Sequence, residues 1–231
     1  SEALVVNTDQ ETLYRVLNNP PQLANSYFTA HSPRSFGLVQ RHRSFDDYLD
    51  AEARYELRPT LMIEPQGDWG DGMIRLIEIP SDLEGNDNIV AFWTYGRGFK
   101  AGDHKSFSYR MHWGSSPAGA SSDLARVART LAGAGGIAGV KPQTDRRKFV
   151  IDFEGAVFAT LSARDVVAAN INIINGTVAG QVLQRVEGHA DMWRLVLEVT
   201  ADGKTAVELR ADLVTDERKL TETWTYQWLK E

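Results

Sequence analysis

The chain has 231 residues and no cysteine, which excludes disulfide bonds, cysteine-ligated zinc and a thiol nucleophile. Its formal net charge of −6 argues against a nucleic-acid partner or an anionic membrane surface. A hydrophobic content of 42% is that of an ordinary folded protein, and no apolar run approaches the roughly 20 residues that cross a bilayer. The chain begins with Ser1 and shows no signal-peptide pattern, so we expect a piece of a longer protein or a chain from which a segment was removed.

Short apolar runs bounded by Gly, Pro, Asn or Asp predict strands in the first half of the chain. The expected strands are residues 3–6, 13–17, 37–41, 57–65, 73–79, 88–95 and 105–114. Asn7-Thr8-Asp9 is the expected turn between the first two strands, and residues 18–36 are expected to be irregular. The continuous apolar run at 88–93 predicts a strand covered on both faces, whereas the alternation at 105–114 predicts a half-buried strand.

The composition changes after residue 114. Gly, Ser, Pro and Ala predict a connection between two domains up to residue 145, and the apolar spacing at 124–132 predicts one short helix within it. Strands are expected again at 147–153, 170–174, 178–186, 192–200, 205–214 and 219–229. Asn175-Gly176 and Asp202-Gly203 are predicted hairpin turns. Short antiparallel strands at this spacing predict an immunoglobulin-like sandwich, so the predicted fold class is all-β.

Two motif matches carry little weight, and two other kinds of site have no motif. Gly133–Ala138 fits a dinucleotide-binding pattern, but that pattern needs a strand before it and a helix after it, so we interpret the segment as a connector. Asn175-Gly176-Thr177 fits a glycosylation acceptor, and a turn is the preferred interpretation. The five histidines have no metal-ligand spacing on a common face, and no hydrolase nucleophile elbow is present. The sequence therefore predicts neither a metal nor a cofactor.

Carboxylates, arginines and tryptophans are concentrated between residues 54 and 94. Carbohydrate sites use this mixture, because aromatic rings stack on pyranose faces while charged and amide groups hydrogen-bond the hydroxyls. Two carboxyl groups can then divide the acid and base work at a glycosidic bond. The alternative is that the acidic residues simply fill turns, as they do in residues 67–72.

Asp87 directly precedes the most apolar predicted strand. A carboxyl group at the mouth of such a strand is expected to lose solvation, which would favour its protonated form and let it donate a proton to a leaving oxygen. Glu84 is close enough to share the turn and add a like charge, and Asn88 could hold the carboxyl group or a substrate hydroxyl. The alternative is that Asp87 and Asn88 cap a turn.

Several long, ordered strings of the sequence resemble the osmoregulated periplasmic glucan biosynthesis proteins of the G and D type. The matching strings are Leu17–Pro20, Phe36–Arg41 with Phe45-Asp46, Arg58–Pro65, Gly67–Gly70, Ile77–Pro80, Asp87–Trp93, Leu124–Val127 through Gly135-Gly136, and Glu222–Gln227. The resemblance implies the C-terminal part of a mutarotase-like β-sandwich at 1–115, a connector at 116–145 and an immunoglobulin-like β-sandwich at 146–231. It also implies that a long N-terminal portion is missing from this chain.

The resemblance further implies an inverting, endo-acting glycoside hydrolase or a transglycosylase that acts on β-1,2-glucan in the periplasm. Asp87 would be the general acid. The candidate substrate-binding residues are Tyr55, Arg58, Glu84, Asn88, Asp68 and Trp69. Trp69 and Trp93 could stack on sugar rings or pack in the core, and for Trp93 we favour the core because it lies inside an apolar strand.

In this family the general base is an Asp in a segment that would precede Ser1. We therefore predict that the chain is inactive alone, and that it associates either with the missing N-terminal portion or with itself as a homodimer. The alternative function is a non-catalytic factor that binds glucan or assists its assembly. A third interpretation makes the immunoglobulin-like domain the interaction surface.

Overall fold

The computed structural model describes residues 1–115, 123–136, 139–140, 145–162, 164–203, 205–216 and 218–230. The described residues form strands joined by turns and three short 3₁₀ helices, so the all-β class is confirmed. The 3₁₀ helices are η1 (Phe45–Asp47), η2 (Tyr55–Leu57) and η3 (Ala156–Thr160). The chain divides into two compact units, Ser1–Ala120 and Ser121–Glu231.

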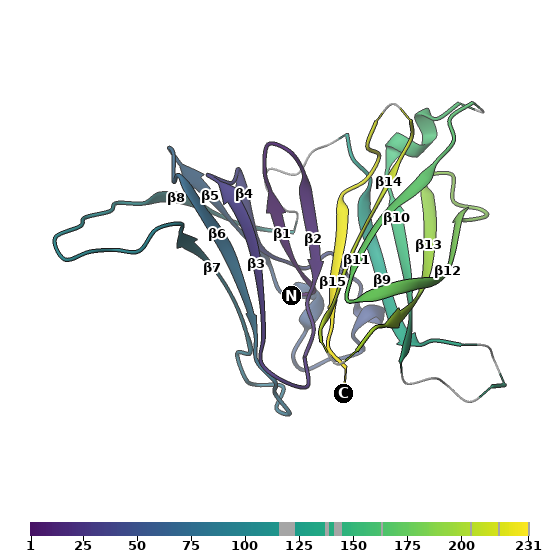
Figure 1. Ribbon diagram of the computed structural model, residues 1–231, viewed down its shortest axis with the longest axis horizontal. Helices are drawn as coiled ribbons and strands as arrows, with labels where there is room; N and C mark the ends of the chain where they lie inside the picture. Colours follow the sequence, from purple (N-terminus) through teal and green to yellow (C-terminus); the bar gives the residue numbers. More distant parts are fainter. Residues whose placement is uncertain are drawn as a thin grey trace. The chain divides into compact units, whose positions relative to one another are not determined.

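The first unit contains eight strands in two sheets (Figure 1). They are β1 (Ala3–Asn7), β2 (Thr12–Val16), β3 (Ala24–His31), β4 (Ser35–Val39), β5 (Thr60–Gln66), β6 (Asp71–Glu78), β7 (Ile89–Tyr95) and β8 (Ser108–Gly114). One sheet has the order β2-β1-β4-β5-β8 and the other the order β3-β6-β7. The pairings within both are antiparallel, and β1 and β2 are joined by the predicted Asn7-Thr8-Asp9 turn. The connection between β7 and β8 projects away from the strands of this unit (Figure 1).

An apolar core lies between the two sheets of the first unit. Its buried members are Leu4, Val6, Leu13, Phe36, Trp69, Ile74 and Leu76. The alternation along β6 explains the packing, because Ile74 and Leu76 point inward while Arg75 points to the other face. Gly72 on the same strand has no room for a side chain, since an added Cβ would lie 2.3 Å from the ring of Trp93.

Three expectations for the first unit were wrong. β3 lies in the segment expected to be irregular, because the Asn and Pro residues at 18–21 end before the strand begins. β7 is not covered on both faces: Val90 is 44% exposed, and β7 is the end strand of its sheet. β8 is not half-buried, since Tyr109, Met111 and Trp113 are 52%, 53% and 63% exposed on this end strand.

The second unit is a sandwich of two antiparallel sheets (Figure 1). Its strands are β9 (Arg126–Ala134), β10 (Arg146–Glu154), β11 (Ala168–Ile174), β12 (Gly176–Arg185), β13 (Met192–Ala201), β14 (Val207–Val214) and β15 (Thr223–Trp228). Within this unit the orders are β12-β13-β10-β9 and β11-β14-β15. Phe149 on β10 packs against Trp224 and Tyr226 on β15, with ring centroids 5.6 and 5.0 Å apart, so aromatic contacts join the two sheets.

The predicted helix at 124–132 is wrong, because this segment forms most of β9 and pairs with β10. Its apolar spacing fitted a helix, but the alternation of buried Ala125 and Val127 with exposed Arg126 fits a strand. The predicted connector at 116–145 therefore includes a strand, and residues 116–122, 137–138 and 141–144 of it lie outside the described residues.

The two predicted hairpin turns of the second unit are also wrong. Asn175 has the expected positive φ of 62°, but the turn leads from β11 to β12, which belong to different sheets. Asp202-Gly203 likewise lies between β13 and β14, which pair with different partners. In both places the residue types correctly indicated a turn of the chain. They did not determine whether the two flanking strands pair with each other.

Candidate functional site

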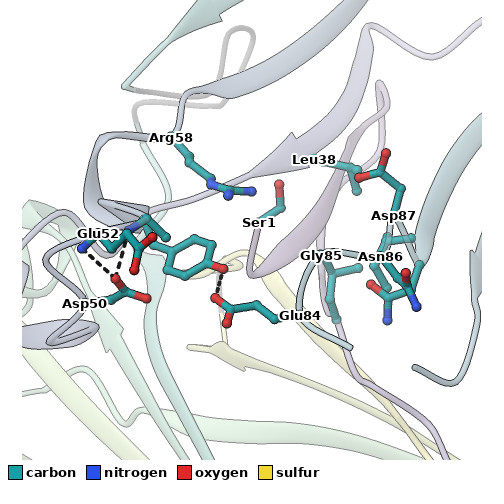
Figure 2. A pocket seen from close by; sticks show the side chains of 14 residues that line it. Ser1, Leu38, Asp50, Glu52, Arg58, Glu84, Gly85, Asn86 and Asp87 are labelled. Carbon is teal, nitrogen blue, oxygen red and sulfur yellow. Dashed lines mark hydrogen bonds between the residues drawn. The ribbon is translucent and has the colours of Figure 1, made fainter. Parts of the chain in front are cut away.

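A cavity of about 820 Å³ opens in the first unit. Its walls come mainly from two segments, residues 50–58 before β5 and residues 84–89, which end the loop after β6 and begin β7. Ser1, Leu17 and Leu38 complete the lining. In the view of Figure 2, Asp87 lies on the opposite side of this cavity from Asp50 and Glu52.

A tight turn and an aromatic residue shape the first wall. One carboxylate oxygen of Asp50 accepts backbone N–H groups from Glu52 at 2.9 Å and Ala53 at 2.8 Å, which is the usual way for Asp to start a turn. Arg54 follows with a left-handed φ of 49° and begins η2, which carries Tyr55. The chain reversal thus brings the Tyr55 side chain to the cavity.

Two side chains from the segment after β4 hold this wall by its backbone. The amide nitrogen of Gln40, a residue only 2% exposed, donates to the carbonyl oxygen of Tyr55. Arg43 donates to the carbonyl oxygens of Glu56, at 3.4 Å, and Arg58. Because these contacts use main-chain atoms, they fix the wall and leave the side chains of Tyr55 and Arg58 directed to the cavity.

Tyr55, Arg58 and Glu84 form a contact between the two walls (Figure 2). The Tyr55 hydroxyl donates to a carboxylate oxygen of Glu84, 29 residues further along the chain. The Arg58 guanidinium carbon lies 4.4 Å from the centroid of the Tyr55 ring, which is the distance of a cation–π contact. Arg58 and Glu84 are both exposed, so a cation, a phenol and a carboxylate are offered together to a ligand.

The second wall is the loop at residues 79–88. The N–H of Ile79 donates to the carbonyl oxygen of Asn88 at 2.8 Å, and the Asn88 amide donates back to the carbonyl oxygen of Ile79 at 3.1 Å. Asn88 therefore closes the loop with its side chain while it lines the cavity. Asp87 lines the cavity as well, but its side chain is exposed, so the expected loss of solvation at the mouth of β7 is wrong.

Asp68 and Trp69 do not line this cavity. They lie in the turn before β6, whereas Glu84 and Asp87 lie in the loop after it, and a strand of eight residues separates the two ends by roughly 25 Å. Asp68 accepts the N–H of Gly70 at 2.7 Å and stands 3.5 Å from a ring nitrogen of His31. Asp68 therefore lies apart from this cavity, at the other end of β6, because sequence proximity does not show which end of a strand a turn occupies.

Trp69 is a core residue. It is 5% exposed, and its ring lies 6.4 Å from Phe36 and 5.9 Å from Trp93, centroid to centroid. Its indole N–H donates to the carbonyl oxygen of Ser108 at 3.1 Å. With its ring covered and its N–H bonded, Trp69 does not offer a face for sugar stacking, and Trp93 packs in the same core as favoured from the sequence.

Other carboxylates of the 54–94 segment are engaged elsewhere. Glu78 is buried and forms an ion pair with Arg15 at 2.8 Å. Glu64 pairs with His112, whose side-chain hydrogen bond holds the pKa of Glu64 below its ordinary value, with a further contribution from Gln66. Glu64 and Glu78 therefore lie on strands and form ion pairs that stabilise the fold. The alternative that acidic residues simply fill turns does not describe these two.

The sequence interpretation missed Asp50 and Glu52, which place two further carboxylates on the first wall. Their only sequence signal was their position just before Tyr55 and Arg58. Within the described ranges, no three His, Asp or Glu side chains converge in an arrangement that could hold a metal ion. The cavity is thus a polar site rich in hydroxyl-binding groups.

An all-β fold with a polar cavity of this kind is typical of proteins that bind carbohydrates. Comparison with known proteins defines the family. The family described as "Periplasmic glucan biosynthesis protein, MdoG" matches residues 1–228, and the chain belongs to it. The expected resemblance to periplasmic glucan biosynthesis proteins is confirmed.

Three curated relatives illustrate the similarity. Glucans biosynthesis protein G of Cereibacter sphaeroides is 50% identical over 231 residues, covering 100% of this chain and 43% of the relative. Glucans biosynthesis protein G of Shewanella sp. strain W3-18-1 is 42% identical over 227 residues, covering 97% and 40%. The probable glucans biosynthesis protein D of Shewanella oneidensis is 38% identical over 232 residues, covering 99% and 42%.

The chain thus spans less than half the length of these relatives. Among the residues that the structure describes, none belongs to a helix with the length and apolar character of a membrane span.

Proposed function

We propose that the full-length protein binds the backbone of β-1,2-glucan in the cavity of the first unit and cleaves it as an inverting endo-acting hydrolase. The observation that supports this most is the gathering of Tyr55, Arg58, Glu84 and Asp87 around one cavity of about 820 Å³ in a chain of a glucan biosynthesis family. Each of these residues offers a group that binds or protonates a sugar oxygen.

In the proposed reaction Asp87 donates its proton to the glycosidic oxygen as the bond from that oxygen to the anomeric carbon breaks. A water molecule attacks the anomeric carbon from the opposite face, and a general base accepts the proton that this water loses. Asp87 ends as a carboxylate, and the new reducing end has inverted configuration. Tyr55, Arg58 and Glu84 hold hydroxyls of the neighbouring sugar rings, with Asn88 on the loop beside Asp87.

The general base is proposed to come from outside the 231 residues. Inverting hydrolases hold their two carboxyl groups about 6.5–9.5 Å apart, which leaves room for the attacking water. The sequence resemblance puts the base in a segment that precedes Ser1 in a longer protein. The partners of this chain are then the glucan and that N-terminal portion, with a homodimer as the alternative partner, and the site of action is the periplasm that the family description names.

The test is the release of new reducing ends from linear β-1,2-glucan by the protein at the full length of its relatives. Release by the wild type and its loss in Asp87→Asn support the hydrolase. Redistribution of chain lengths without a net gain of reducing ends favours the transglycosylase alternative. Unchanged glucan with binding intact favours a binding or assembly factor. Hydrolysis by the 231-residue chain alone would contradict an external base.

A further inference from the structure

The side chain of Asn19 bonds the loop that carries Asp87. Asn19 belongs to the connection between β2 and β3, far from this loop in the sequence. Its amide nitrogen donates to the carbonyl oxygen of Ser81 at 2.8 Å, and its amide oxygen accepts the N–H of Ser81 at 3.0 Å. The same oxygen accepts from the amide of Asn88, next to Asp87, at 3.4 Å. The Asn19 amide thus bonds both backbone groups of Ser81, as a paired β-strand would. It also accepts a hydrogen bond from Asn88 at the other end of the loop.

The connection that carries Asn19 is itself fixed to a rigid part of the fold. The N–H of Asn18 donates to a carboxylate oxygen of Glu78 at 2.6 Å. The other oxygen of Glu78 pairs with Arg15 at 2.8 Å, and these two side chains are only 1% and 2% exposed. A buried ion pair keeps its geometry, and Glu78 is the last residue of β6. The backbone next to Asn19 is therefore fixed to the end of β6.

The Ser81 hydroxyl connects Asn19 to the rest of the loop through hydrogen bonds. Its hydroxyl donates to the carbonyl oxygen of Leu83 at 2.9 Å and accepts the N–H of Leu83 at 3.2 Å. It also accepts from the amide of Asn86 at 3.0 Å. The N–H of Asn86 donates to the carbonyl oxygen of Leu83 at 3.2 Å, which closes the turn that contains Glu84 and directly precedes Asp87. The contacts therefore run from Asn19 through Ser81 to the turn that carries Glu84 and leads into Asp87.

We propose that Asn19 is a positioning residue that holds the 79–88 loop, and with it Asp87 and Glu84, at a fixed place against the wall of Tyr55 and Arg58. This inference rests on the proposed function of Asp87. An exposed loop of ten residues has no core of its own, so its position depends on such contacts. A displacement of about 1 Å at a reacting group can lower a rate by about a hundredfold, and this loop carries the group that must meet the leaving oxygen.

The test compares Asn19→Ala with Asn19→Asp in the full-length protein acting on linear β-1,2-glucan. Asn19→Ala is expected to lower kcat by about 10- to 100-fold while KM changes less than about threefold, because binding groups on the first wall stay in place. Asn19→Asp keeps the acceptor for Ser81 and Asn88 and loses the donor, so it is expected to fall between the wild type and Asn19→Ala. Asn25→Ala is the matched control. The Asn25 amide oxygen accepts a hydrogen bond from Arg75 at 3.2 Å, and Asn25 does not line the cavity.

Amide hydrogen exchange supplies the second readout. The N–H groups of Ile79 and Asn86 are bonded within the loop and do not touch Asn19, so faster exchange at both in Asn19→Ala would report loosening of the whole loop. Lower kcat together with faster exchange supports the inference. Unchanged exchange, or faster exchange with unchanged kcat, overturns it.

The two proposals can fail separately. If the wild type releases no reducing ends, the hydrolase proposal fails, and glucan binding then decides about Asn19. Faster loop exchange with weaker glucan binding in Asn19→Ala retains Asn19 as a residue that positions a binding wall. Unchanged binding overturns it in that case as well.

Discussion

Two charged regions of the molecule use their carboxylates in opposite ways. In the second unit, Asp152 is 1% exposed at the centre of a row across three strands, paired in register with Arg129 on β9 and Arg194 on β13. Arg194 donates to it at 2.7 and 2.9 Å, and Arg129 at 2.8 and 3.1 Å. In the first unit, Asp87 is exposed on a loop that lines a cavity.

The hydrogen-bond partners of each carboxylate decide whether it is available to a ligand. Burial alone would raise the pKa of Asp152, but hydrogen bonds from Arg194 and Arg129 hold its pKa below the ordinary value. Such a group already accepts hydrogen bonds from two arginines and serves the fold. The carboxylates of the cavity lie on loops and remain accessible, which is why we assign the chemistry to the first unit and a structural role to the ion-paired row of the second.

The largest loss of activity is expected for Asp87→Asn, and a neighbouring aspartate on the same loop provides the comparison. In the full-length protein, Asp87→Asn is expected to lower kcat on β-1,2-glucan by about 10²- to 10⁴-fold, the usual contribution of a general acid, because the amide cannot donate the required proton. Glucan affinity should stay within about a factor of three of the wild type, since the variant keeps the size of the side chain. Asp82→Asn is the control, because Asp82 is exposed on the loop and does not line the cavity. Equal losses in the two variants would count against a specific role for Asp87.

The second effect distinguishes a core tryptophan from a sugar platform. Trp69→Ala is expected to lower the free energy of unfolding by about 3–5 kcal/mol, because it empties the space between Phe36 and Trp93. Trp69→Phe should keep part of this stability and all of the glucan affinity. Urea unfolding and glucan titration of both variants measure this. Loss of affinity at unchanged stability would restore the sugar-stacking role.

The third effect concerns the ion-paired row of the second unit. Asp152→Asn is expected to lower the free energy of unfolding at pH 7 by about 1–3 kcal/mol, because two arginines lose their charged acceptor, and to leave turnover unchanged. Since the pKa of Asp152 is lowered in the folded state, its contribution is present above the ordinary value of 3.8 and is lost as the pH falls through the folded pKa.

Urea unfolding at pH 7 and at pH values below 4 should therefore show the difference between wild type and Asp152→Asn shrinking as the pH falls. Glu154→Gln is a suitable control, because its partner Arg126 is 57% exposed and surface pairs contribute little. A difference that grows in acid would contradict the assignment.

The smallest effect tests the contact between the cavity walls. Tyr55→Phe removes the hydroxyl that donates to Glu84 and keeps the ring beneath Arg58, so kcat/KM is expected to fall by about tenfold, the equivalent of one hydrogen bond. Tyr27→Phe serves as the control, since Tyr27 is 56% exposed on β3 and does not line the cavity. Steady-state kinetics on the two variants would show the difference, and equal values would remove Tyr55 from the site.

Much of the fold could be predicted from short-range pattern. Alternating apolar residues and turn-forming pairs located most strands, because both depend on neighbours in the sequence. Polar residues such as Asn25 and Thr29 hid β3, and Asn175-Gly176 could not reveal that β11 and β12 join different sheets. Sheet membership depends on contacts between distant segments, which local pattern does not contain.

The site was predictable to a similar degree. Tyr55, Arg58, Glu84 and Asp87 were chosen mainly through the family resemblance, and the structure places all four at one cavity, while their roles stay predictions. The turn of Asp68 could not be separated from them, because the sequence does not show that β6 places it at the far end. Asp50 and Glu52 had no signal beyond their position before Tyr55 and Arg58. The contacts of Asn19 with Ser81 and Asn88 join segments 62 and 69 residues apart, which only the fold brings together.

Amide hydrogen exchange of full-length Asp87→Asn, with and without a β-1,2-glucan oligosaccharide, tests directly whether the cavity of the first unit binds the glucan. Slower exchange is expected on binding at residues 50–58 and 79–89, with the strands β9, β10 and β13 around Asp152 unchanged. Protection of those strands of the second unit, with the loops of the first unit unaffected, would contradict it.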